Sequence, residues 1–152
     1  MKKVCLIALL ICFLPIMAQA ENSTVIVSID PFGLSEGNFN LQCEGVINPN
    51  SSWIIRGGTF YMGSGITVGM RHYFEGSAPQ KVWIGGLIGY ASSIVTGSAF
   101  VAAGDVGYKW IIGNSFIIEP HGGIGYASVE IPTFGNVSGV AVFLGLNLGY
   151  ML

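Results

Sequence analysis

Cysteine is scarce in this chain of 152 residues, and its distribution excludes a disulfide-stapled fold. Cys5 and Cys12 lie within the first 20 residues, and only Cys43 lies beyond them. Without those 20 residues no intramolecular disulfide can form, so something else must hold the fold together. The two histidines, His72 and His121, make no ligand cluster with Cys43 at a usual spacing. No metal site and no cofactor is therefore expected.

Charge is also scarce. Charged residues make up 9% of the chain, against about 25% in ordinary soluble domains. The four Lys and Arg residues beyond position 20 form no basic patch, which disfavours a nucleic-acid partner. Hydrophobic residues make up 51% of the chain. A surface this poor in charge is expected to lie in lipid or in an assembly.

The first 20 residues have the three parts of a secretory signal peptide. Lys2 and Lys3 are followed by an apolar run from Val4 to Met17 and then by small residues around Gln19. The run has 14 residues, and a membrane-spanning helix needs roughly 20. We predict cleavage before Glu21, which leaves residues 21–152 as one domain with four basic and eight acidic residues.

Two stretches without charge, 82–104 and 131–152, are long enough to suggest transmembrane helices. Glycine argues against helices, because all 23 glycines follow residue 20 and each costs a helix interior up to about 1 kcal/mol. Turn-forming clusters such as Asn48-Pro49-Asn50 and Gly113-Asn114-Ser115 also break the chain at short intervals. The pattern favours short strands.

Alternation with a period of two residues supports strands. Phe39, Leu41 and Cys43 alternate with Asn40, Gln42 and Glu44, and similar alternation recurs up to the C-terminus. The sequence predicts eight strands, at about 24–30, 38–47, 53–61, 65–74, 81–92, 99–112, 116–130 and 139–152.

We predict an all-β, eight-stranded antiparallel transmembrane β-barrel, with the apolar faces outward and the polar faces inward. A soluble barrel would turn the apolar faces inward, and the period fits both alternatives. Scarcity of charge favours lipid outside. If both termini face the periplasm, the outer loops fall at about 30–37, 61–65, 92–98 and 130–139, too short for a large binding surface. The last of them, with Pro132, Phe134 and Asn136, could make a small contact.

Charged residues on the polar faces predict an ion-pair network that fills the lumen, since unpaired charge there is costly. The candidates are Glu44, Arg56, Arg71, Asp105, Lys109 and Glu119. Glycines on the same faces would make room for these long side chains. Aromatic residues near predicted strand ends indicate a girdle at the membrane interface, with Tyr73, Trp83, Tyr108, Trp110 and Tyr150 as its candidates.

The alternating final strand, with Tyr150 third from the end, resembles that of the small bacterial outer-membrane β-barrel proteins of the OmpA-domain and OmpX-like group. The stretch Gly104 to Trp110, continuing through Glu119 to Tyr126, also resembles small barrels of this kind. The last residue departs from the pattern, being Leu152 where an aromatic is typical. The resemblance implies outer-membrane lipids as surroundings and the barrel-assembly machinery as a partner during biogenesis.

The expected function is that of a porin-like, non-enzymatic outer-membrane barrel with a structural or envelope-maintenance role. One alternative is a lipid-modifying enzyme centred on His121 and Ser128 with Glu119 or Glu130, although no nucleophile elbow is present. Another is a narrow pore or small-molecule carrier, which a filled lumen disfavours.

Overall fold

The computed structural model describes residues 24–35, 37–60, 63–93, 97–131 and 135–152. The predicted signal peptide, 1–20, lies outside the described residues. The eight predicted strands are confirmed. They are β1 (Val25–Ile29), β2 (Phe39–Asn48), β3 (Ser51–Phe60), β4 (Gly63–Tyr73), β5 (Lys81–Ser93), β6 (Gly97–Ile112), β7 (Phe116–Ile131) and β8 (Gly135–Met151).

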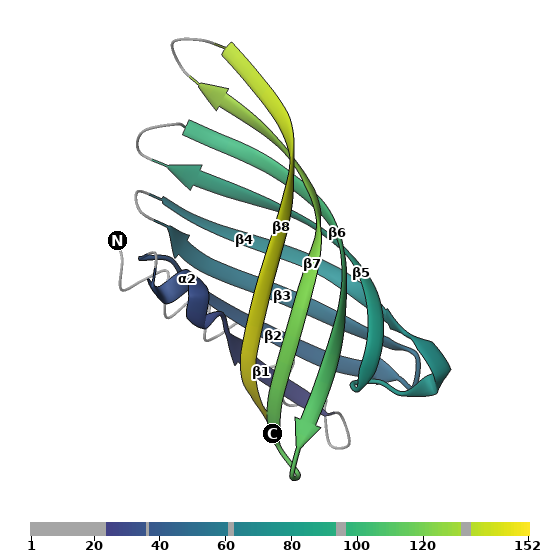
Figure 1. Cartoon of the computed structure of the whole chain (residues 1–152). Helices are drawn as coiled ribbons and strands as arrows, with labels where there is room; N and C mark the ends of the chain where they lie inside the picture. The colour runs from purple at the N-terminus through teal and green to yellow at the C-terminus, as the bar shows by residue number, and fades with distance from the viewer. Residues whose placement is uncertain (1–23, 36, 61–62, 94–96, 132–134) are drawn as a thin grey trace.

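The strands form one closed antiparallel barrel in sequence order, β1 to β8 (Figure 1). Closure comes from β1 and β8, where Ile26 to Ile29 pair with Met151 to Leu148. In their described residues the two charge-free stretches are therefore strands and not helices, as their glycine content indicated. Among the described residues no helix is long and apolar enough to cross a membrane.

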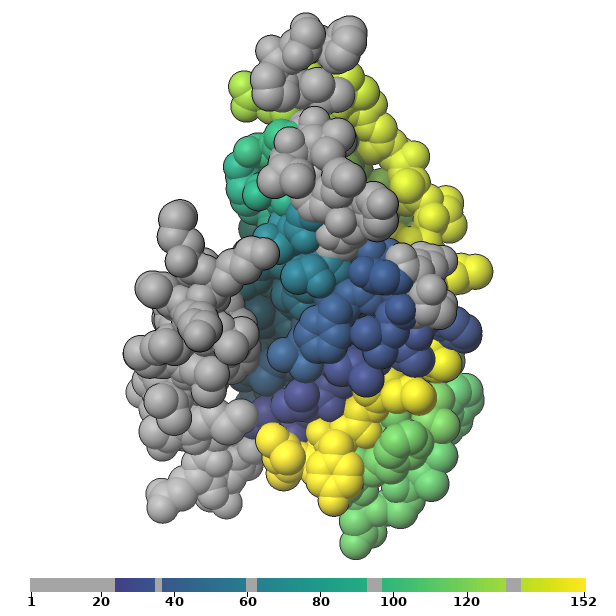
Figure 2. Space-filling model, turned by 90° about the vertical axis from the view of Figure 1, so that its left-hand side faces the viewer, coloured from purple at the N-terminus to yellow at the C-terminus, as the bar shows by residue number. Residues whose placement is uncertain are grey.

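The barrel wall is uneven in height because β1 has 5 residues and β8 has 17. In Figure 1 the hairpins of β5 to β8 rise well above β1 and β2. The pairing of β1 with β8 stops at Leu148. In the described part of the chain, the β8 edge from Gly135 to Asn147 therefore pairs with no residue of β1. In Figure 2 the yellow C-terminal end of β8 lies against the purple β1, where the two strands pair.

A short helix, α2 (Pro31–Ser35), follows β1 and was not predicted. Asp30 directly precedes the helix, and its Oδ1 accepts hydrogen bonds from the backbone N–H groups of Phe32 (2.9 Å) and Gly33 (3.2 Å). This satisfies two of the free donors at the start of a helix, as an N-cap does. Because α2 packs against β2 and β8, it lies beside the gap that the early end of β1 leaves.

Register places the polar and apolar residues on opposite faces of the barrel wall. Gln42, Glu44, Arg71 and Asn147 are buried in the lumen. On β4 the neighbours of Arg71 point outward: Met70 is 57% exposed, and His72 is exposed as well. Strand ends differ from prediction by a few residues. The largest shift is in β8, which begins at Gly135 because its glycine and serine residues still pair with β7.

Candidate functional site

Four buried charges cross the lumen in one layer, which we call the charged layer: Glu44, Arg71, Lys109 and Glu119. Arg71 bridges the two carboxylates, with Nη1 2.5 Å from Glu44 Oε2 and Nη2 2.8 Å from Glu119 Oε1. Lys109 Nζ contacts Glu44 Oε2 as well and lies 2.9 Å from Glu119 Oε2. Two cations and two anions therefore neutralise each other through direct contacts.

Neutral donors complete the charged layer around Glu44 and Glu119. Glu44 Oε1 accepts hydrogen bonds from the hydroxyls of Tyr73 and Ser52, the latter at 2.7 Å. Asn147 Nδ2 donates to Glu119 Oε1 at 2.9 Å. Buried charges are tolerated when their remaining lone pairs are also hydrogen-bonded. Five strands, β2, β3, β4, β6 and β7, are cross-linked through Glu44 and Glu119 by these contacts, together with β8 through Asn147.

A second ion pair lies on the upper side of the charged layer. Arg56 Nη2 lies 2.9 Å from Asp105 Oδ2, and Arg56 Nε donates to Gln42 Oε1 at 2.8 Å. Gln42 also accepts from Arg71 and Asn147, which links the pair to the layer below. The structure thus brings all six predicted lumen charges into one connected network.

The prediction that Tyr73 and Trp83 belong to a membrane-interface girdle is wrong, because both are fully buried in the lumen. Strand parity explains this. Tyr73 follows the inward Arg71 by two residues and pairs with Trp83 across the sheet. Trp83 supports the charged layer, with the Arg71 guanidinium carbon 3.7 Å from the centre of its ring. A cation over an aromatic face is attracted to it.

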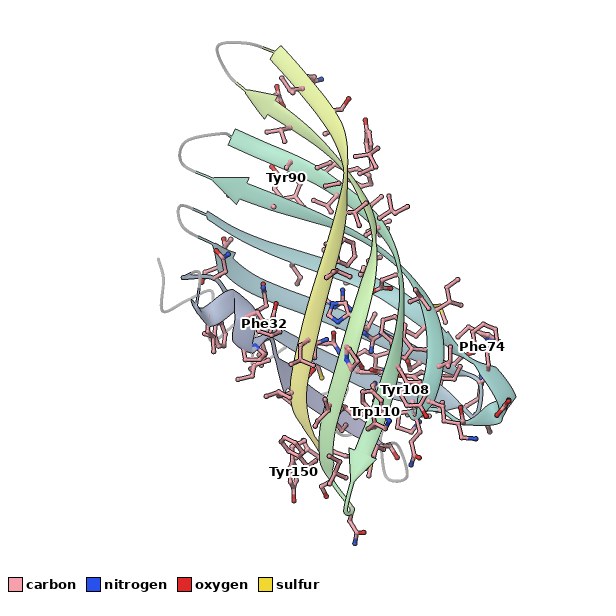
Figure 3. All side chains as sticks on the ribbon, viewed as in Figure 1. Phe32, Phe74, Tyr90, Tyr108, Trp110 and Tyr150 are labelled. Atoms are coloured by element: carbon pink, nitrogen blue, oxygen red, sulfur yellow. The ribbon has the colours of Figure 1, made fainter. Side chains whose placement is uncertain are left out.

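Tyr108, Trp110 and Tyr150 do point outward, as an interface girdle requires. Figure 3 shows them near the end of the barrel that carries the C-terminus. The rings of Tyr108 and Trp110 lie with their centres 4.7 Å apart. Three of the five predicted interface aromatics therefore share one rim.

Lumen glycines stand opposite the largest inward side chains. A Cβ on Gly107 would lie 2.5 Å from the Trp83 ring, and one on Gly145 would lie 2.6 Å from the His121 ring. A Cβ on Gly85 would lie 2.6 Å from a carboxylate oxygen of Asp105. These contacts are too short for any real side chain, so the glycines provide the space in which the network and its aromatic supports fit.

Above the second ion pair the lumen holds a cavity of about 460 Å³. Its walls include Leu87, Ala91, Val101, Ala103 and Phe143. Its polar lining residues include Asp30, Gln42, Arg56, His121 and Asn147. We call this cavity the apolar chamber. Sequence reasoning missed it, although the signal was visible in the small apolar residues at inward positions in the upper half of β5 to β8.

The residues proposed for a hydrolase do not come together. His121 lies in the lumen beside Trp83 and Phe143, whereas Ser128 pairs with the exposed Phe100 and shares its outward face. Seven residues along one strand separate them by roughly 20 Å. Glu130 also lies on the outward face. No nucleophile and base are thus in contact at this site.

Of the predicted contact loop, Pro132 and Phe134 lie outside the described residues, and Asn136 belongs to β8. Among the described residues no three His, Cys, Asp or Glu side chains are grouped to hold a metal ion.

No protein-family model matches the chain. The comparison with curated proteins finds no match either. The class that the fold defines is a closed eight-stranded antiparallel β-barrel with a charged lumen.

Proposed function

We propose that the protein is an integral outer-membrane β-barrel with a structural, envelope-maintaining role. The observation that carries the proposal is the distribution of apolar surface. Along β4, Ile66, Val68 and Met70 are between 44% and 57% exposed, while their inward neighbour Arg71 is 2% exposed. A soluble barrel buries its apolar face, so this inside-out arrangement supports lipid as the surrounding solvent.

The exposed apolar surface continues from β4 onto β5, β6 and β7. Ile84 and Ile88 on β5, Val106 on β6, and Ile124 on β7 are each more than half exposed. Contiguous apolar patches beyond a few hundred Å² are rare on soluble monomers. In a bilayer the same surface is solvated by acyl chains. Pairing of the strands gives their backbone N–H and C=O groups the hydrogen bonds that lipid cannot supply.

The charged layer favours a structural barrel over a pore. Because Arg71 and Lys109 are almost completely buried and bound to both carboxylates, ions would have to break these contacts to pass. We therefore expect purified protein in a planar lipid bilayer to show no conductance steps. Conductance steps in the unsubstituted protein would instead establish a pore.

Export through a cleaved signal peptide, insertion by the barrel-assembly machinery and residence among outer-membrane lipids follow from the same proposal. We expect residues 21–152 to refold in detergent with a β-type circular dichroism spectrum. The folded form should migrate differently from the boiled form on a gel. A helical spectrum would contradict the barrel, and a β spectrum in water without detergent would contradict the membrane location.

A charge placed on the outer face gives a sharper test. Ile88 lies midway along β5 and is 55% exposed. In a bilayer Ile88→Arg should destabilise the barrel by about 2–4 kcal/mol, the cost of Arg on a lipid face near the midplane. Asn114→Arg in the exposed 113–115 turn is the matched control and should cost less than about 0.5 kcal/mol. Equal effects of the two substitutions on urea unfolding in vesicles would exclude lipid at Ile88.

A further inference from the structure

The lumen changes character along its height. Below, its inward residues are charged and hydrogen-bonded. Above the Arg56–Asp105 pair, inward positions on β5, β6, β7 and β8 carry Ala91, Ala99, Val101, Ala103, Ala127 and Ala141. At this height the inward face of these four strands is therefore apolar.

These small residues leave space where an eight-stranded barrel is ordinarily filled by its own side chains. The apolar chamber of about 460 Å³ lies within the usual range for ligand pockets, roughly 300–1,000 Å³. Walls that are mostly apolar and carry a few polar groups are also typical of such pockets. The chamber therefore fits an elongated apolar group with one polar end.

The polar end of the chamber does not favour an anion. Arg56 is neutralised by Asp105, and the charged layer beneath is neutral. Asp30 adds a carboxylate at the rim, so the described lumen has four acidic groups and three basic ones. Gln42, Asn147 and His121 offer neutral hydrogen-bonding groups beside them. A hydroxyl or a similar neutral head matches this floor better than a carboxylate or phosphate.

The chamber also reaches the gap in the wall. Its lining includes Leu144 and Gly145 on β8 and Asn40 and Leu41 on β2, the strands on either side of the place where β1 has ended. Leu144 is 88% exposed, and the β8 edge above Leu148 has no β1 partner among the described residues. The helix α2 packs against both β2 and β8 here, so it borders the chamber on this side.

From these observations we propose that the apolar chamber binds a single-chain amphiphile with an uncharged, hydrogen-bonding head. The head lies against Gln42, Arg56 and Asn147, and the chain lies along Leu87, Val101, Ala103 and Phe143. Binding in the chamber does not rest on the proposed membrane location.

Photolabelling tests the site directly. The probe is dodecan-1-ol carrying a chain diazirine, added to the refolded barrel in lipid nanodiscs, irradiated and mapped by peptide mass spectrometry. Lipid-face adducts at outward residues such as Ile88 serve as the internal reference. We expect additional adducts at the inward residues Leu87, Val101 and Phe143. Adducts confined to outward residues would overturn the proposal.

Two neighbours on β6 provide matched variants, since Ala103 lines the chamber and Ala102 points outward. Ala103→Phe should reduce chamber labelling by about tenfold or more, because a ring fills the space that the chain would occupy. Ala102→Phe should leave it unchanged. Equal chamber labelling in the two variants would contradict the site, provided that each shows the heat-dependent gel shift.

Competition tests the chamber without any substitution. Excess unlabelled dodecan-1-ol should suppress chamber adducts, and dodecanoate should compete about tenfold less well, a difference of about 1.4 kcal/mol in binding free energy. Equal competition would overturn the neutral head. If outward adducts are absent while chamber adducts persist, the membrane proposal fails and the binding site stands.

Discussion

Removing the charge of Glu44 should destabilise this barrel much more than removing an exposed charge. Glu44 is fully buried and accepts hydrogen bonds from four side chains: Arg71, Lys109, Tyr73 and Ser52. In Glu44→Gln, Arg71 and Lys109 would share the single carboxylate of Glu119. An excess positive charge would then be trapped away from water, and the amide nitrogen would face donors.

Breaking a buried ion pair by removing one partner costs about 3–5 kcal/mol. Against a typical unfolding free energy of about 5–15 kcal/mol, this is a large fraction of the stability. The assay is urea unfolding of the refolded barrel in lipid vesicles, followed by tryptophan fluorescence. We expect a lower midpoint with an unchanged urea dependence, which would mean that stability changes and compactness does not.

Glu75→Gln is the matched control. Glu75 is 76% exposed on its side chain and pairs with Lys81 at 3.3 Å. Exposed pairs contribute less than about 1 kcal/mol. A second check is Glu44→Gln combined with Lys109→Met, which removes the excess cation and should recover at least about 1 kcal/mol through coupling. The reasoning would be refuted if Glu44→Gln cost no more than Glu75→Gln.

Two further predictions concern the lumen packing. Gly107→Ala should cost about 1–3 kcal/mol, because its Cβ would overlap the Trp83 ring, whereas Gly86→Ala, with open space around it, should change unfolding by less than about 0.5 kcal/mol; equal urea midpoints would contradict the packing argument. Trp83→Leu should lose more stability than Trp83→Phe by about 0.5–2 kcal/mol, since only Phe keeps an aromatic face for Arg71. Indistinguishable midpoints for this pair would show that the cation–ring contact contributes nothing.

The strand pattern was predictable because it is local. Alternation of apolar and polar residues fixes the two faces of each strand, and glycine with turn clusters limits strand length. Parity also placed the six charges of the network on the polar faces, and the scarcity of charge indicated that these faces point inward. The same parity should have placed Tyr73 inward two residues after Arg71. Proximity to a strand end was the weaker signal, and it misplaced Tyr73 and Trp83.

The short helix α2 was less accessible from sequence. Its five residues have no helical periodicity long enough to detect, and its N-cap depends on Asp30 folding back over Phe32 and Gly33. Its position against β8 also requires that β1 end early. Neither condition can be inferred from local propensity.

By itself the sequence determined the number of strands, their two faces and the position of the charged residues on the polar face, since the period of a strand depends only on its own backbone. The tertiary structure decided which charges meet, how Trp83 supports Arg71, and where the wall opens beside β8. Those features depend on register between strands far apart in the chain. The apolar chamber likewise exists only because closure brings the small residues of four strands to one height.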